Sequence, residues 1–398
     1  MLRAALLSLL WSPPAAPRGR PAGWNCSCSA QRFCRPLPAS AALAEREVLA
    51  TWGAVPQALR PLSDINWTVT TTLLLGAWPG SSIWSFESPN ATELLCTAHS
   101  HGVRVVLDAP FNEWWPNNRA SNYQKPARLN ATMREAMAQA ALDVVFAHGF
   151  DGVNFDLEGR FAAELQPDVT ALLRTVRTRF KAALPHAQIS FWLDLAAQTR
   201  PAAFNLPAIA ASVDLVAVMA YDLISNQSAI AGPELRLGFL HDEMEGIIAA
   251  GVPPAQLAVG FGWRSTAFTC AETDPATEVC TCTDTVMYDG RTVCNAERHG
   301  YFWGVSEQAK SIARWSEAEQ ATYFNLPNAS GGRLRQVWLN GPRTLAPRYA
   351  WARQRGLRGV AMWTADGVCC WPPWVGPDAA AEAAMWEAVA EHFVAEPS

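Results

Sequence analysis

From residue 47 onward, short apolar segments alternate with longer segments in which apolar residues recur at helical spacing. Eight short segments, most of them rich in Val, Ile, Leu or Phe, predict buried β-strands. They cover residues 47–52, 68–78, 102–109, 152–158, 189–195, 215–221, 257–263 and 359–363. Helices are predicted between them at residues 91–100, 132–148, 168–184, 233–250 and 345–354, and a closing helix at 378–394.

Alternating strands and helices predict a parallel α/β fold, and eight strands in a chain of 398 residues fit a (β/α)8 TIM barrel. An open doubly wound sheet is the alternative. No G-x-G-x-x-G loop opens a helix after the first strand, which disfavours a dinucleotide-binding sheet. The interval 264–356 is long for one connection and contains four cysteines. We therefore expect an insertion there, between strands 7 and 8, on the face of the functional loops.

Composition narrows the class of protein. Hydrophobic residues make up 50% of the chain and charged residues 17%, which allows a large core. The net charge of -5, without a run of Lys or Arg, disfavours a nucleic-acid partner. The 18 tryptophans either fill the core or form flat platforms for sugar rings. The seven histidines show no metal-ligand spacing, so we expect neither a metal nor a cofactor.

The N-terminal region and the cysteines indicate the secretory pathway. Arg3 precedes an apolar run at residues 4–11 and a Pro-rich stretch, which predicts a signal peptide over residues 1–24 and a mature domain over 25–398. No later run reaches the ~18 apolar residues of a membrane span. Ten clustered cysteines fit disulfides better than zinc, with their pairing open. Six N-x-S/T sequons predict glycosylation at Asn25, Asn66, Asn90, Asn130, Asn226 and Asn328.

The stretch at residues 149–159 contains the strongest chemical signal. Three polar residues alternate there with apolar ones, so they share one face of the predicted strand: Asn154, Asp156 and Glu158. Inward polar groups at the C-terminal end of a barrel strand are where catalytic residues lie. Crowding by Asp156 and partial burial would favour the protonated form of Glu158, which could then donate to a glycosidic oxygen. A buried hydrogen-bond network without catalysis is the alternative.

Two other strand ends carry aromatic residues. Tyr221 and Met219 share a face at the end of the sixth strand, and Trp363 should point inward from the eighth. Taken alone, both aromatic residues would be structural. Trp263 and Asp194 are weaker candidates for the same cleft. A serine hydrolase is disfavoured because no G-x-S-x-G elbow appears.

These residues resemble the signatures D-G-x-D-x-D-x-E and M-x-Y-D of glycosyl hydrolase family 18, the chitinase family. Within the family the chain looks like the chitobiases, over most of residues 24–395 and most weakly over 269–332. Asn154 stands where the signature usually has Asp. The resemblance implies a retaining mechanism in which the substrate's own 2-acetamido group attacks the anomeric carbon, an exception to the two-carboxylate rule.

The resemblance also implies a role for each site residue. Glu158 would be the proton donor and then the base, Asp156 would orient the acetamido N–H, and Tyr221 would bond the acetamido oxygen. Asp151 and Asn154 would support Asp156. The implied substrate-binding residues are Met219, Asp222, Trp363, Trp338 and Asn340.

The family resemblance implies a monomeric lysosomal glycosidase acting on chitooligosaccharides or the chitobiose core of N-glycans, with secretion as the alternative to the lysosome. Its rivals are an endochitinase, a chitin-binding lectin on the same fold and an inactive paralogue. Lectins of this kind commonly lose the acid, whereas Glu158, Asp156 and Tyr221 are all present here. The sequence therefore favours an enzyme, and it leaves exo or endo action open.

Overall fold

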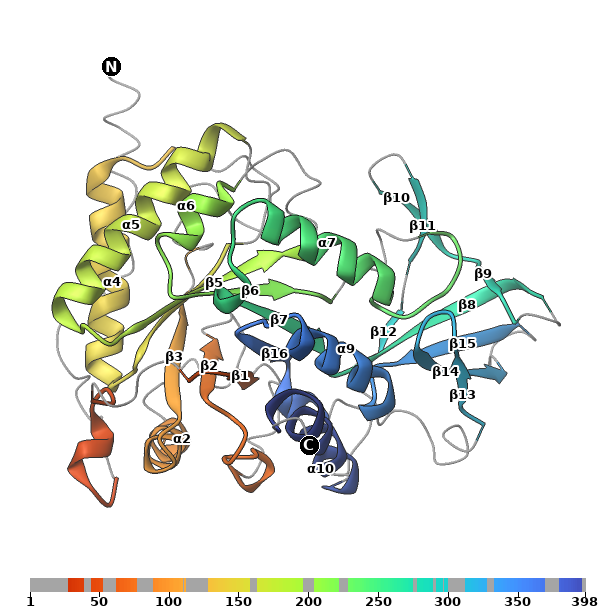
Figure 1. Cartoon of the computed structure of the whole chain (residues 1–398), viewed down its shortest axis with the longest axis horizontal. Helices are drawn as coiled ribbons and strands as arrows, with labels where there is room; N and C mark the ends of the chain where they lie inside the picture. The colour runs from red at the N-terminus through yellow and green to blue at the C-terminus, as the bar shows by residue number, and fades with distance from the viewer. Residues whose placement is uncertain are drawn as a thin grey trace.

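The fold is a closed barrel of eight parallel strands surrounded by helices (Figure 1). The computed structural model describes residues 28–38, 44–52, 62–76, 89–109, 111, 128–157, 163–195, 204–221, 228–274, 278–288, 291–295, 297–299, 312–327, 333–368 and 379–395. The barrel strands are β1 (Glu47–Trp52), β2 (Thr72–Gly76), β3 (Arg104–Ala109), β4 (Gly152–Asp156), β5 (Gln188–Asp194), β6 (Leu215–Met219), β7 (Leu257–Gly262) and β16 (Gly359–Trp363). The order β1-β16-β7-β6-β5-β4-β3-β2 confirms the predicted (β/α)8 barrel.

Helices cover the outside of the barrel and bury the outward residues of its strands. They are α2 (Pro89–Ser100), α4 (Ala131–His148), α5 (Gln166–Ala183), α6 (Leu206–Ala210), α7 (Leu237–Ala249), α9 (Pro342–Gln354) and α10 (Ala379–Val389). Short turns of helix are η1 (Gln31–Cys34), η2 (Leu62–Asp64), η4 (Ala163–Leu165), η7 (Pro254–Gln256), η8 (Ala365–Val368) and η9 (Ala390–Val394). None of the helices in the described ranges is long and apolar enough to cross a membrane.

The ends of α4 show how local sequence sets these helices. The Asn130 side chain accepts a hydrogen bond from the Met133 N–H at 2.9 Å, which caps the helix start. Gly149 ends the helix with a φ of 74°, a conformation that glycine adopts without strain. A Cβ at Gly149 would lie 2.7 Å from the Cys34 carbonyl oxygen, so glycine also lets the N-terminal segment pack against this corner.

The barrel interior is closed at the N-terminal ends of the strands by a buried ion pair. Arg104 donates to the two Glu47 carboxylate oxygens at 2.7 and 2.6 Å and to Gln188 Oε1 at 2.8 Å. An apolar layer lies above this floor: Leu49, Leu74, Val106, Leu215, Ala217, Ala258 and Ala361. Access to the interior is therefore from the C-terminal ends of the strands.

Between β7 and β16 the chain forms an antiparallel sheet beside the barrel (Figure 1). Its strands are β8 (Ser265–Thr273), β9 (Cys280–Cys282), β12 (Glu297–His299), β13 (Arg314–Ser316), β14 (Ala321–Pro327) and β15 (Leu334–Leu339), and a separate hairpin pairs β10 (Thr285–Tyr288) with β11 (Arg291–Cys294). We call residues 265–339 the insertion. The helix α9, inside the interval expected to be inserted, packs on β16 and α10 instead.

Three disulfides between described residues confirm the oxidised state expected of the cysteines. Cys28 bonds to Cys96 and ties the N-terminal segment to α2. Cys270–Cys280 and Cys282–Cys294 lie in the insertion. Because the insertion sheet is small, these two links are expected to replace part of the hydrophobic core that it lacks.

Candidate active site

The polar residues of β4 lie inside the barrel at the C-terminal end of the strand. Asn154 is fully buried and Asp156 nearly so, whereas Val153 and Phe155 pack in the outer core. This alternation matches the face predicted from sequence. It places Asp156 at the mouth of the barrel, above the apolar layer.

A hydrogen-bonded row crosses three strands at the level of Asn154. The Asn154 side-chain N–H donates to Asp108 Oδ1 on β3 at 2.8 Å, and the Ser190 hydroxyl on β5 donates to Asn154 Oδ1 at 2.7 Å. The strand register aligns all three residues. Neither Asp108 nor Ser190 was predicted. The available signal was that each shares a strand face with a residue of the inner apolar cluster, Asp108 with Val106 and Ser190 with Trp192.

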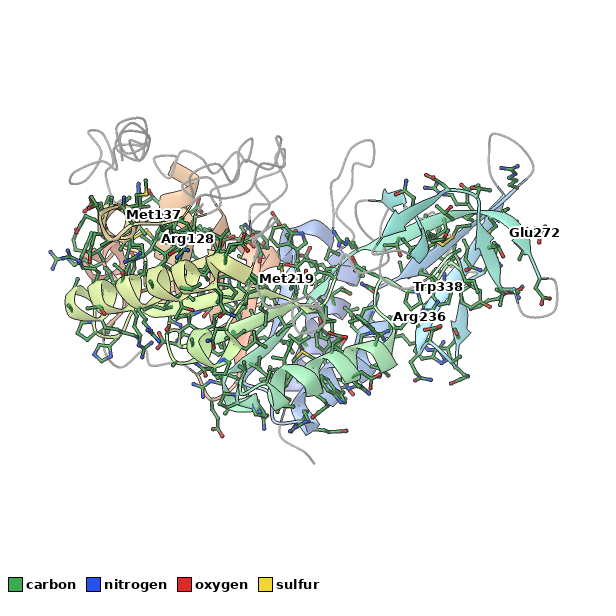
Figure 2. The ribbon with its side chains drawn as sticks, turned by 90° about the horizontal axis from the view of Figure 1, so that it is seen from above. Arg128, Met137, Met219, Arg236, Glu272 and Trp338 are labelled. Carbon is green, nitrogen blue, oxygen red and sulfur yellow. A yellow bond between two sulfur atoms is a disulfide. The ribbon has the colours of Figure 1, made fainter. Side chains whose placement is uncertain are left out.

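Aromatic side chains form the opposite part of the barrel mouth. The rings of Tyr221 and Trp363 stack, with centroids 5.9 Å apart and planes 14° apart. Trp192 packs edge-on against Tyr221 at 6.2 Å. Met219 and Trp363 are only partly buried and pack against this inner cluster, and Figure 2 shows Met219 within the barrel. Sequence reasoning missed Trp192, whose indole fills the interior from β5.

Glycine on β7 makes room for this cluster. A Cβ at Gly260 would lie 2.9 Å from Trp192 Cζ3, closer than real side chains approach. A Cβ at Gly262 would lie 2.6 Å from a Glu234 carboxylate oxygen. Toward the mouth, the inward face of β7 is therefore kept free of side chains by Gly260 and Gly262, so that larger groups from neighbouring segments can occupy this space.

A buried ion pair borders the mouth next to Tyr221. Arg264 Nε donates to Glu234 Oε1 at 2.7 Å, and the guanidinium lies 5.8 Å from the centre of the Tyr221 ring. Asn340 donates its side-chain N–H groups to Glu234 Oε2 at 2.8 Å and to the Gly262 carbonyl at 3.0 Å. Asn340 therefore holds Glu234 in place through its side-chain nitrogen, and its contact with a sugar stays a prediction.

Comparison with known proteins identifies the family. The model for glycosyl hydrolases family 18 matches residues 115–367. The chain belongs to this family. Over 357 residues it is 25% identical to di-N-acetylchitobiase of Rattus norvegicus, covering 86% of this chain and 87% of the relative. It is 23% identical to the Homo sapiens di-N-acetylchitobiase over 359 residues, covering 87% and 83%.

Solved structures of family 18 share the fold. The C-terminal domain of a putative chitinase from Desulfitobacterium hafniense matches with a TM-score of 0.66 and 16% identity, covering 88% of this chain and 100% of that domain. A Cycas revoluta chitinase solved with (GlcNAc)3 matches with a TM-score of 0.66 and 16% identity, covering 87% and 99%. The expected family 18 glycoside hydrolase and its barrel are thus confirmed.

Two residues with implied site roles lie elsewhere in this family 18 fold. Asp151 stands at the N-terminal end of β4, where it accepts the Leu37 N–H at 2.6 Å, the Val105 N–H at 2.7 Å and a hydrogen bond from His99 Nε2 at 2.8 Å. Five residues of strand place it about 16 Å from Asp156. The expectation that Asp151 supports Asp156 directly is therefore corrected: it anchors the barrel floor.

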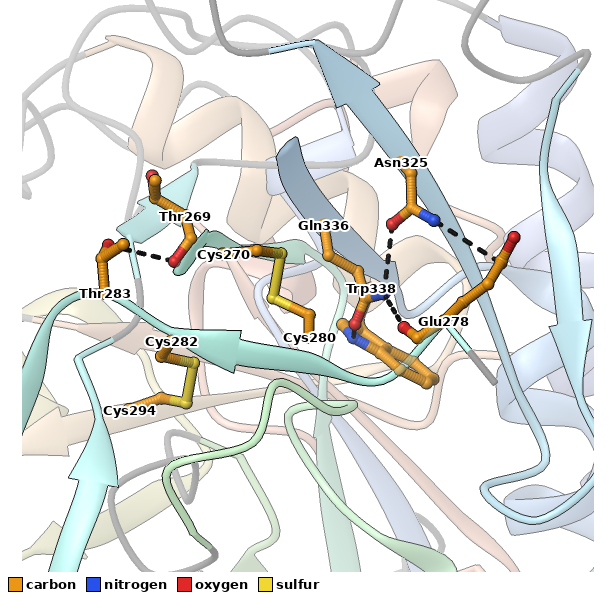
Figure 3. Close-up of a disulfide and its surroundings, with 10 residues drawn as sticks. All are labelled: Thr269, Cys270, Glu278, Cys280, Cys282, Thr283, Cys294, Asn325, Gln336 and Trp338. Atoms are coloured by element: carbon orange, nitrogen blue, oxygen red, sulfur yellow. Dashed lines mark hydrogen bonds between the residues drawn. A yellow bond between two sulfur atoms is a disulfide. The ribbon is translucent and has the colours of Figure 1, made fainter. Parts of the chain in front are cut away.

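Trp338 lies in the insertion. It is 7% exposed and packs against the disulfide-bonded Cys270 and Cys280 in the core of the insertion (Figures 2 and 3). Its indole stacks on Tyr323 at 4.9 Å and donates to Gln336 Oε1 at 2.9 Å. Trp338 therefore helps to stabilise the insertion, and its contact with a sugar stays a prediction.

Trp263 faces away from the cleft as well. It is fully buried on the outside of β7, donates to the Tyr349 hydroxyl at 2.9 Å and meets the Trp386 ring edge-on. Several of the abundant tryptophans thus fill the core. They are Trp52, Trp192, Trp263, Trp338 and Trp386.

Several predicted residues fall outside the described part of the chain: Glu158, Asp222, Asn25, Asn226 and Asn328, together with the side chain of Asn90. Two sequon asparagines are described. Asn130 is exposed at the start of α4, and partly exposed Asn66 accepts a hydrogen bond from the Thr68 hydroxyl at 2.7 Å. Both use the side-chain oxygen, which leaves the nitrogen available for a glycan. Within the described ranges, no group of three His, Cys, Asp or Glu could hold a metal ion.

Proposed function

We propose that this family 18 hydrolase cleaves β-1,4 linkages between N-acetylglucosamine residues in chitooligosaccharides or in the chitobiose core of N-glycans. The observation that carries the proposal is the inward polar face of β4, formed by Asn154 and Asp156. It faces the stacked Tyr221 and Trp363 across the barrel mouth. Similarity to several di-N-acetylchitobiases supports this substrate class.

The chemistry proposed for β4 follows from its alternation. Glu158 comes two residues after Asp156 in the sequence, the spacing at which side chains of an extended chain share a face. It would protonate the leaving glycosidic oxygen and later take a proton from water. No second protein carboxylate is needed as nucleophile, because the 2-acetamido oxygen of the sugar attacks the anomeric carbon with net retention.

Asp156 and Tyr221 are proposed to control the acetamido group. Asp156 is 6% exposed, so its carboxylate is poorly hydrated and interacts strongly with the positive charge that develops on the oxazolinium-like intermediate. The Tyr221 hydroxyl would donate to the acetamido oxygen and align it for attack. The adjacent ring of Trp363 would support the apolar face of the sugar, with Met219 beside it.

We place the enzyme in the lysosome, with secretion as the alternative. The disulfides require an oxidising compartment during folding, and the six sequons suit a secretory-pathway protein. We further propose a monomer that takes an oligosaccharide as its only partner.

The deciding experiment is hydrolysis of N,N'-diacetylchitobiose and chitotetraose by the purified chain, its Glu158→Gln variant and a surface control, Glu135→Gln. Glu135 lies on α4 and pairs with Arg179 at 2.7 Å, so its replacement should leave turnover unchanged. We expect monomer release by the wild type and a loss of at least about 100-fold in Glu158→Gln. Products are quantified by chromatography.

Other results would change the assignment. Dimer release from chitotetraose would make the enzyme an endochitinase. Sugar binding without any turnover by the wild type would make it a lectin and overturn the proposed activity.

A further inference from the structure

Asp108 is a buried carboxyl group that the proposed reaction does not use. It lies inside the barrel on β3 and is 4% exposed. A carboxylate can only accept hydrogen bonds, so the contact to Asp108 fixes which end of the Asn154 amide points toward β3. The amide oxygen then points toward β5, where the Ser190 hydroxyl donates to it. The row Asp108–Asn154–Ser190 therefore has one defined direction.

The strand register also places Asp108 close to the catalytic end of β4. Asp108 is aligned with Asn154, and Asp156 follows two residues later on the same face. Neighbouring strands about 4.8 Å apart, with a rise of about 3.3 Å per residue, put the Cα atoms of Asp108 and Asp156 ~8 Å apart. At this separation in a poorly hydrated interior, the charge on one group changes the proton affinity of the other.

The charged groups around this row can be named strand by strand. On β2, the neighbour of Asp108 is Gly76. On β4 the ionisable group is Asp156, followed by Glu158 beyond the described strand, and on β5 it is Asp194 at the strand end. The floor ion pair Glu47–Arg104 lies below the apolar layer and is internally balanced. The Arg264–Glu234 pair lies on the far side of Tyr221.

We propose that Asp108 is a positioning residue for the β4 carboxyl groups: it orients the Asn154 amide and supplies, from β3, the negative charge that this amide cannot carry. The charge raises the proton affinity of Asp156 and, through the role proposed for Glu158, extends the acid step to higher pH. The inference rests on the proposed function, because it assigns a role within that reaction.

A charge-relocation series tests the proposal. Asp108→Asn keeps an oxygen that can accept from Asn154 but removes the charge. The alkaline limb of its kcat/KM pH profile should shift to lower pH by about one unit, as expected for losing a charge ~8 Å away. Asn154→Asp puts two carboxyl groups side by side and should move the limb up. The double variant Asp108→Asn/Asn154→Asp moves the charge from β3 to β4 and should return the limb toward the wild-type position.

The control is Asp143→Asn on the exposed side of α4, where Asp143 accepts from Gln139 at 2.8 Å. It should leave the limb in place. A purely structural Asp108 would lower melting temperature or kcat without moving the limb. An unmoved limb in Asp108→Asn, or a double variant no closer to wild type than Asn154→Asp, would overturn the inference.

A second readout separates this inference from the proposed function. An inactive wild type would refute the function, whereas the pairing can be measured by thermal unfolding without substrate. Two adjacent carboxyl groups raise the pKa of one of them in the fold, so Asn154→Asp should lose stability as pH rises above about 4. The double variant Asp108→Asn/Asn154→Asp should recover this lost stability. Equal melting curves for Asn154→Asp and the wild type at pH 7 would show that carboxyl groups at positions 108 and 154 do not interact, which would overturn the inference.

Discussion

At the scale of single residues, the contact between Gly260 and Trp192 sets the shape of the barrel mouth. A Cβ at Gly260 would also lie 3.3 Å from the Val218 carbonyl, so backbone and indole both restrict that side. We expect Gly260→Ala to lower the free energy of unfolding by about 1–3 kcal/mol through overpacking. Adding Trp192→Phe, which removes the clashing part of the indole, should recover part of the loss in chemical denaturation. Additive losses in the double variant would contradict this contact.

Residue-level prediction from sequence succeeded where a repeated pattern was present. Asn154 and Asp156 were found because polar and apolar residues alternate along β4. Asp108 and Ser190 do not belong to a repeated polar pattern, and only the register across β3, β4 and β5 reveals that both meet Asn154. The packing of Trp338 in the insertion could not be predicted, because sequence does not show which face of an insertion strand is covered by disulfides.

At the scale of elements, β4 has a structural end and a reacting end. Asp151, at the structural end, accepts hydrogen bonds from two backbone N–H groups and from His99. The other ring nitrogen of His99 contacts the Phe33 carbonyl at 2.7 Å. The carboxyl therefore connects the N-terminal segment, α2 and β3 to the barrel floor. Asp156, at the other end, faces the mouth.

The two ends should respond differently to the same substitution. In Asp151→Asn, one carboxylate oxygen is replaced by an NH2 group that faces another hydrogen-bond donor. The free energy of unfolding should therefore fall by about 1–3 kcal/mol. Its kcat/KM should stay near the wild-type value. Asp156→Asn should lose about 100-fold or more in kcat/KM with a smaller change in stability. Denaturant melts and initial rates measure both. A large rate loss in Asp151→Asn at full stability would restore its implied role in supporting Asp156.

Element order was largely predictable because each barrel strand is a short apolar run between helices. The ends were less predictable: β2 begins at Thr72 and α7 at Leu237, each four residues after its predicted start. The antiparallel strands of the insertion could not be ordered from sequence. Their pairing joins segments as distant as β8 and β15, and it is fixed by contacts that local periodicity does not encode.

At the scale of the whole molecule, one buried histidine bears on stability in acid. His148 ends α4 with 5% exposure and packs against the Phe150 ring at 5.7 Å. Burial lowers the pKa of His148 from 6.5 to about 4. The unfolded chain therefore binds a proton between these values that the fold does not, so stability is complete above pH 6.5 and is lost as the pH falls toward 4.

We expect the burial of His148 to lower the free energy of unfolding by about 1–3 kcal/mol at pH 4 relative to pH 7. In His148→Gln the fall in melting temperature between pH 7 and pH 4.5 should be smaller than in the wild type. His186→Gln, at an exposed site, serves as the control and should leave that difference unchanged. Identical pH dependence in wild type and His148→Gln would show that burial of His148 does not govern acid stability.

The row from Asp108 to Ser190 also has a consequence for how related chains diverge. An exchange of Asn154 for Asp beside an unchanged Asp108 creates two adjacent negative charges, whereas removing Asp108 first leaves the row uncharged. The route through the uncharged row avoids that repulsion. Homologous genes should therefore show coupled substitution at Asp108 and Asn154. Where Asn154 is replaced by Asp, an uncharged residue should replace Asp108. Once both have changed, restoring Asp108 alone becomes unfavourable, because it would place two carboxylates side by side.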